Sequence, residues 1–229
     1  MIFQVFKRGS QIPTGPVEGN QMYKTHAIAC QKFSQKSADN LFKVVMMAAS
    51  SIKQPWSNIG KQLKDIESIG VDSKYLFGFK RDTYLYMETH KHKIHSQMLA
   101  VINSKKTDDE KAKSLMTIFL RVKGLGLAKA GFVCQLTAGL VGCMDSHNIK
   151  RYGVEPNSLN LNRNPRGKKA LETNATKLVN YISLCHKHGT ETMWNEWCSF
   201  VANKDKKAKK FWLDANHVSV VHYTYLIRA

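Results

Sequence analysis

Long apolar runs are missing from this chain of 229 residues. No uninterrupted stretch reaches the roughly 18–20 apolar residues that a membrane-spanning helix needs. Only a few apolar side chains precede Lys7 and Arg8, which is too few for a secretory signal peptide. The five cysteines are an odd number and lack the spacing of a disulfide framework. These absences predict an intracellular protein in a reducing compartment rather than a secreted one.

Acidic residues are the second shortage, with 17 Asp and Glu against 35 Lys and Arg and a net charge of +18. A surface this basic repels itself unless a polyanion neutralises it. Nucleic acid is the first polyanion that the charge suggests, and an anionic membrane surface is the second. The alternative interpretation, a basic protein with no dedicated anion site, stays open. Hydrophobic residues make up 43% of the chain, which is ordinary for a globular protein.

The spacing of apolar residues predicts a mostly or all α fold. Residues 1–37 begin with a segment rich in Pro and Gly, which indicates loops. The stretch from Tyr75 to Tyr86 is rich in aromatic residues and fits either a strand or a helix. A last element is expected after Lys209. Caps and periodicity predict helices over residues 37–54, 57–70, 87–105, 107–122, 127–140, 170–187 and 191–203.

The two clearest helices are separated by the four residues Lys123-Gly124-Leu125-Gly126. Glycines allow positive φ angles and a close approach of another group to the backbone. The backbone N–H groups at the start of the second helix would then attract an anion, helped by the helix dipole. Lys123 and Lys129 flank this spot with positive charge, and Leu125 would turn inward between the helices. The hairpin is therefore a candidate contact for DNA phosphate.

The segment VKGLGLAKAGFV resembles the hairpin of the helix-hairpin-helix DNA glycosylase superfamily, whose core reads roughly L-P-G-V-G-x-x-T-A. Lys123 replaces the usual proline, and Lys129 stands where threonine is common. The resemblance implies a two-lobed helical fold, with the core lobe at 38–152 and the second lobe formed by 1–37 plus 153–229. It implies that DNA contacts come from Lys123, Gly124, Leu125, Gly126, Ala128, Lys129, Ser146 and His147.

A single acid, Asp145, ends the most apolar part of the chain. It stands 19 positions after Gly126, within Met144-Asp145-Ser146-His147. In the superfamily an aspartate at about this distance, in a motif like V-D-T-H, is catalytic. Hydrolysis of an N-glycosidic bond builds positive charge on the sugar, which a carboxylate beside C1′ would stabilise while orienting a nucleophile. The alternative role of Asp145 is to cap the next helix, and the two roles are compatible.

Members of the superfamily that also cleave the DNA strand carry a lysine two residues after the second glycine. That position is Ala128 here, which favours a monofunctional enzyme that uses water. Lys129 is one residue further on and stays an alternative amine nucleophile. No iron–sulfur cluster is expected, since the C-terminal part offers only Cys185 and Cys198. No cofactor is expected, although a monovalent cation at the hairpin stays open.

The helix FKVVMMAASS resembles the early helix of the superfamily, which ends near a loop that inserts into DNA. The distance of 73 positions from Ser51 to Gly124 fits the same comparison. Contacts around a flipped base, or a wedge, are therefore expected from Ser50, Ser51, Lys53 and Gln54.

These expectations combine into a monomeric DNA glycosylase that acts on a damaged or modified base flipped out of double-stranded DNA, with no membrane partner. The first rival is a non-catalytic DNA-binding protein that uses the hairpin. The second is a bifunctional glycosylase and abasic-site lyase. The third is a basic protein that only coats DNA. The histidines of HKHKIH are possible metal ligands, but no Cys, Asp or Glu nearby completes a set, so a solvated or DNA-facing surface and no metal site are expected.

Overall fold

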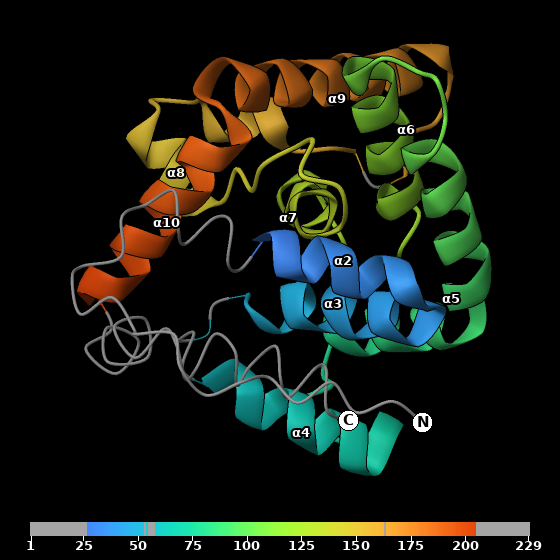
Figure 1. Ribbon diagram of the computed structural model, residues 1–229. Coiled ribbons are helices and arrows are strands. Elements are labelled where there is room, and N and C mark those ends of the chain that lie inside the picture. Colours follow the sequence, from blue (N-terminus) through green and yellow to red (C-terminus); the bar gives the residue numbers. More distant parts are fainter. Residues whose placement is uncertain (1–26, 53, 55–57, 163, 205–229) are drawn as a thin grey trace, which may run out of the picture.

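The computed structural model describes residues 27–52, 54, 58–162 and 164–204, and these residues form helices without any strand (Figure 1). The mostly α prediction is therefore confirmed for the described part of the chain. The α-helices are α2 (Ile28–Lys36), α3 (Ala38–Ser50), α4 (Ile59–Ile69), α5 (Phe79–Ile102), α6 (Asp108–Leu120), α7 (Leu127–Thr137), α8 (Ser146–Arg151), α9 (Lys168–His188) and α10 (Thr190–Lys204). Two short 3₁₀ turns are η3 (Gly70–Asp72) and η4 (Pro156–Leu159).

Helix α7 lies in the middle of the helices (Figure 1). It contacts α2 and α3 on one side and α6 on another, while α9 crosses above it. Every residue of α7 except Ala128 and Lys129 is buried. The sequence predicts this because α7 is apolar around nearly its whole circumference, as in helices that are covered on all sides.

Capping residues and glycines in the sequence predict most of the helix ends. Ser37 caps α3 by accepting a hydrogen bond from the backbone N–H of Asn40 at 3.1 Å, and Gly70, with φ of +61°, ends α4. Helix α5 begins at Phe79, which decides between the strand and the helix left open for the aromatic stretch. Helix α2 follows the segment rich in Pro and Gly and is not among the helices that the sequence predicts, because its apolar residues are too few to give a clear periodicity. The element expected after Lys209 lies outside the described residues.

The start of α6 contains the capping box that the sequence predicts. The side chain of Thr107 accepts from the N–H of Glu110, and the carboxylate of Glu110 accepts from the N–H of Thr107 at 2.9 Å. The bonds that the Glu110 carboxylate accepts from the backbone N–H and from the hydroxyl of Thr107 lower the pKa of this exposed carboxyl. We expect Thr107→Ala to reduce the free energy of unfolding by about 1 kcal/mol. Urea denaturation measures this, and Thr117→Ala, on the exposed face of the same helix, serves as the control; equal stabilities of the two variants would contradict the role of the cap.

Most buried residues belong to one core cluster that extends from Ala27 to Trp194 and includes residues of α2, α3, α5, α6, α7, α9 and α10. The division into lobes at 38–152 and 1–37 plus 153–229 stays a prediction. Among the described residues, no helix combines the length and the apolar character that crossing a bilayer requires.

Candidate functional site

The turn between α6 and α7 packs closely against the start of α5. Gly124 has φ of +86°, and a Cβ atom there would lie 2.5 Å from Thr83 Oγ1 and 2.6 Å from the carbonyl oxygen of Phe79. The Thr83 hydroxyl lies 2.8 Å from the carbonyl of Lys123 and can donate to it. Glycine is therefore required at position 124 by both its backbone angle and its lack of a side chain.

The first turn of α7 faces outward from this hairpin. Leu125 is buried between the helices, as the sequence predicts, while Lys123, Gly124 and Gly126 are exposed. The N–H groups of Lys129 and Ala130 both donate to the carbonyl of Gly126. The N–H groups of the residues before Lys129 lie at the start of the helix, where backbone N–H groups have no acceptor within the helix. The hairpin thus presents the start of a helix beside exposed residues; that it contacts DNA stays a prediction.

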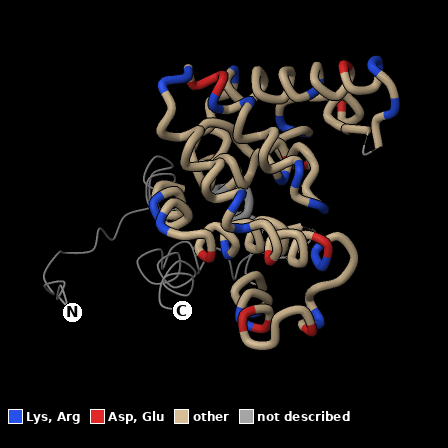
Figure 2. The backbone as a smooth tube through the Cα atoms, turned by 90° about the vertical axis from the view of Figure 1, so that its right-hand side faces the viewer, with Lys and Arg blue, Asp and Glu red and all other residues tan. Residues whose placement is uncertain are grey.

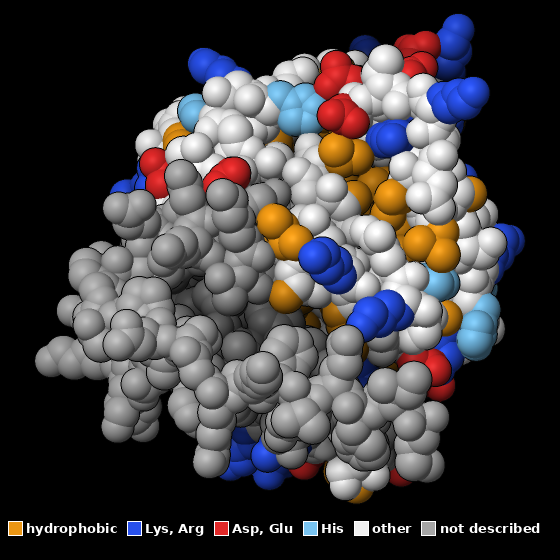
Figure 3. Space-filling view, viewed as in Figure 1, with side chains coloured by type: hydrophobic (Ala, Val, Ile, Leu, Met, Phe, Trp, Pro, Cys, Tyr) orange, Lys and Arg blue, Asp and Glu red, His pale blue; other side chains and the backbone are white. Residues whose placement is uncertain are grey.

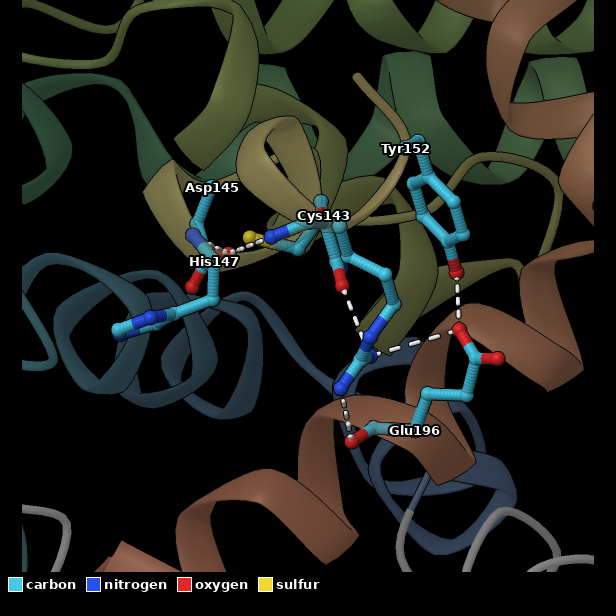
Figure 4. A network of polar contacts seen from close by, with 7 residues as sticks. Cys143, Asp145, His147, Tyr152 and Glu196 are labelled. Atoms are coloured by element: carbon cyan, nitrogen blue, oxygen red, sulfur yellow. Dashed lines mark hydrogen bonds and ion pairs between the residues drawn. The ribbon is translucent and has the colours of Figure 1, made fainter. Parts of the chain in front are cut away.

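Asp145 is the N-cap of α8. Its Oδ1 atom accepts hydrogen bonds from the N–H groups of His147 and Asn148, both at 3.0 Å (Figure 4). Its Oδ2 atom accepts a third bond, also at 3.0 Å, from the indole N–H of Trp197 on α10. The carboxylate is half-buried, whereas Ser146 and His147 are exposed. The capping role of Asp145 is confirmed, and a catalytic role in addition stays a prediction.

Lys129 projects from α7 toward the end of α3. Its Nζ atom donates to the hydroxyl of Ser51 at 2.8 Å and lies 5.2 Å from the ring centre of Phe132. Burial raises the pKa of the Cys143 thiol to about 12. The nearby ammonium of Lys129 acts against this rise, and the carboxylate of Asp145 adds to it. The Lys129 ammonium and the Asp145 carboxylate therefore act in opposite directions on the pKa of the same buried thiol.

Three aromatic rings connect Lys129 with Asp145. Phe132 of α7 lies with its ring centre 5.9 Å from those of both Trp194 and Trp197, and the two tryptophan rings are 5.4 Å apart. Trp194 is buried, and its indole N–H has no hydrogen-bond partner among the described residues. Trp197 is half-buried. The sequence indicates that the two tryptophans share a helix face, but it gives no signal that one of them reaches Asp145.

The residues expected around a flipped base lie at the C-terminal end of α3. Ser51 meets Lys129, as described above. Ser50 is fully buried, and its hydroxyl has no partner among the described residues. The side-chain oxygen of Gln54 lies 3.4 Å from the amide nitrogen of Gln62, and Lys53 lies outside the described residues. The structure therefore brings Ser51 to Lys129, while contacts of this segment with DNA stay a prediction.

Helix α10 is tied to both ends of α8. Trp197 reaches the N-cap, and the neighbouring Glu196 accepts from the Tyr152 hydroxyl and pairs with Arg151 at 3.4 Å at the C-terminal end (Figure 4). Burial, together with the bond to Glu196, raises the pKa of the Tyr152 phenol. Tyr152 therefore stays a neutral donor, and the short helix α8 is held between two contacts with α10.

Basic residues are spread over several helices and loops in the described part of the chain (Figure 2). On the face seen in Figure 3, they alternate with apolar and uncharged side chains rather than forming one continuous patch. His90 stacks on Tyr86, and His95 bonds the carbonyl of Gln35. Within the described ranges, no group of three or more His, Cys, Asp or Glu side chains is arranged to hold a metal ion.

No protein-family model, curated protein or solved structure matches this chain.

Proposed function

We propose that the chain is an intracellular DNA glycosylase. It would bind duplex DNA through the α6–α7 hairpin, take a damaged or modified base out of the stack, and hydrolyse its N-glycosidic bond. The products would be the free base and an abasic site.

The observation that supports this proposal is the placement of a carboxylate and an ammonium on one aromatic cluster: Asp145 accepts from Trp197, whose ring lies 5.9 Å from that of Phe132, and Lys129 lies over Phe132. Asp145 and Lys129 come from different elements, and both are half-buried. The Asp145 carboxylate accepts from the indole N–H of Trp197, and the Lys129 ammonium donates to the hydroxyl of Ser51. A capping residue alone needs no cation and no ring of aromatic side chains in its surroundings. Opposite charges at a half-buried site beside a basic hairpin suit a reaction on a polyanion.

In the proposed reaction, Asp145 faces the sugar of the flipped nucleotide. As the glycosidic bond breaks, positive charge develops on the sugar ring, and the carboxylate stabilises it. Asp145 also orients the water that attacks C1′ and accepts its proton. The hydroxyl of Ser50 and the indole N–H of Trp194 are buried donors without partners among the described residues, and a flipped base with carbonyl or ring-nitrogen acceptors would give such groups a partner.

A second candidate function is a glycosylase with lyase activity. It is favoured by the position of Lys129, whose amine lies over the ring of Phe132, next to Trp197, the partner of Asp145. In that case the amine, once deprotonated, would attack C1′ and form a Schiff base with the opened sugar. Its bond to Ser51 and its place over Phe132 suit a purely electrostatic role equally well.

A panel of duplex oligonucleotides tests the proposal. Each duplex carries one altered base: uracil, an oxidised purine, an alkylated purine, a mismatch or a hypermodified pyrimidine. We expect strand breaks at one kind of base, and only after hot alkali, because alkali cleaves the abasic sites that a monofunctional enzyme leaves. Breaks without alkali, with a borohydride-trapped adduct that Lys129→Ala abolishes, would instead establish the lyase. Tight, salt-sensitive binding with no base release from any duplex would contradict both and leave a DNA-binding protein.

A further inference from the structure

We propose that Trp197 is a positioning residue for Asp145 and that Oδ2 is the reacting oxygen of this carboxylate. The inference rests on the proposed function and adds to it a role for α10, which no feature of the hairpin requires. It starts from the indole N–H of Trp197, which donates to Asp145 Oδ2 at 3.0 Å across 52 positions of the chain.

The acceptor positions of the carboxylate decide which oxygen is available. A carboxylate has about four lone-pair positions, two on each oxygen. The N–H groups of His147 and Asn148 use both positions on Oδ1, as the start of α8 requires. The indole N–H of Trp197 uses one position on Oδ2. The remaining position, on Oδ2, is the one from which a nucleophilic water would be held.

The indole also fixes the direction of that remaining position. The two bonds to Oδ1 alone leave the carboxylate free to tilt, because both donors lie on the α8 side. A third donor on Oδ2 from another helix removes this freedom. The Trp197 ring is held in turn by Phe132 at 5.9 Å and Trp194 at 5.4 Å between ring centres. A reacting group displaced by about 1 Å can lose a hundredfold in rate.

Helix α10 is placed firmly enough for this role. Glu196 precedes Trp197, and its carboxylate accepts hydrogen bonds from the guanidinium of Arg151, the last residue of α8, and from the hydroxyl of Tyr152, the next residue. The backbone carbonyl of Glu196 accepts a further bond from Arg151 at 3.3 Å. The position of Trp197 relative to Asp145 is therefore set by contacts on both sides of the residue, one aromatic and one polar.

Trp197→Phe tests the inference, because phenylalanine keeps an aromatic ring but removes the N–H donor. We expect the single-turnover rate of base release to fall by about ten- to a hundredfold, with no change in DNA affinity. Tyr86→Phe is the control: it also keeps an aromatic ring and removes a polar hydrogen, but it lies on α5, which packs on α3 and α6, so the rate should stay that of the wild type. A wild-type rate in Trp197→Phe, or equal losses in both variants, would overturn the inference.

The indole resonances of the DNA-free protein provide a readout that does not depend on activity. The four tryptophans give four indole N–H signals, and the signal that Trp197→Phe removes belongs to Trp197. We expect Asp145→Ala to displace this signal and Tyr86→Phe, on α5, to leave it in place. If the wild type releases no base from any duplex, the proposed function fails, yet a displaced signal still supports Trp197 as the residue that holds Asp145. An unmoved signal overturns the positioning role.

Discussion

Asp145→Asn is expected to reduce base release by at least about a hundredfold while DNA binding is retained. The substitution removes the negative charge that would stabilise the positive sugar in the transition state, and losses of two to three orders of magnitude are usual when one such electrostatic group is removed. The start of α8 should be kept, because asparagine is as good an N-cap as aspartate and its side-chain oxygen can still accept from the N–H groups of His147 and Asn148. The amide nitrogen would face the indole N–H of Trp197 as a second donor, so the Trp197 bond is lost in this variant. Single-turnover rates and DNA affinities of the two proteins measure the effect.

Asp145→Ala separates the capping role from catalysis. Alanine removes the cap as well as the charge, so this variant should also lose about 1 kcal/mol in the free energy of unfolding. If the asparagine variant released base at the wild-type rate and only the alanine variant lost activity, Asp145 would be a structural cap and nothing more. The reaction would then have to depend on another group, with Lys129 as the first to examine by substitution.

Gly131→Ala is expected to be the most destabilising small substitution in the core. A Cβ atom at position 131 would lie 2.2 Å from the Tyr181 hydroxyl oxygen and 2.6 Å from the carbonyl oxygen of Gly142. Neither atom can withdraw easily, because the Tyr181 hydroxyl donates to Gly142 at 2.8 Å and accepts from the N–H of Met144 at 2.9 Å. Burial raises the pKa of the Tyr181 phenol, so the donor stays neutral.

Overpacking of this kind costs about 1–3 kcal/mol, and breaking the Tyr181 bonds would add the cost of buried polar groups without partners. We therefore expect Tm to fall by roughly 6–12 °C, at a few degrees for each kcal/mol in a chain of this size. Gly126→Ala is the control, because φ there is −96° and no heavy atom lies within 4 Å of its Cβ position. Equal Tm values for the two variants would contradict the close approach of α9 to α7.

The same contact links stability to the candidate site. Tyr181 holds Gly142 and Met144, which lie directly before Asp145 in the chain. A shift of α9 away from α7 would therefore move the segment that presents the carboxylate. Partial loss of base release in Gly131→Ala at temperatures well below its Tm would be the expected consequence.

Several features of this protein could be predicted from the sequence because they depend on neighbouring residues. The Thr107–Glu110 capping box, the end of α4 at Gly70 and the cap at Ser37 each involve side chains and backbone groups a few positions apart. The burial of α7 follows from its composition, because a helix with no polar face has no side that it can leave in water. Asp145 at a helix start is also local, since its first two partners are the next residues in the chain.

The surroundings of Asp145 and Lys129 could not be predicted in the same way. The partner of Lys129 is 78 positions away at Ser51, and that of Asp145 is 52 positions away at Trp197. The spacing of Trp194 and Trp197 shows only that they share a face of α10, and a shared face indicates burial without naming what it packs against. The sequence by itself determined most of the helices, the turn between α6 and α7 and the position of one carboxylate at a helix start. Only the tertiary structure decided which groups surround that carboxylate, because helix packing brings together side chains whose separation along the chain carries no periodic signal.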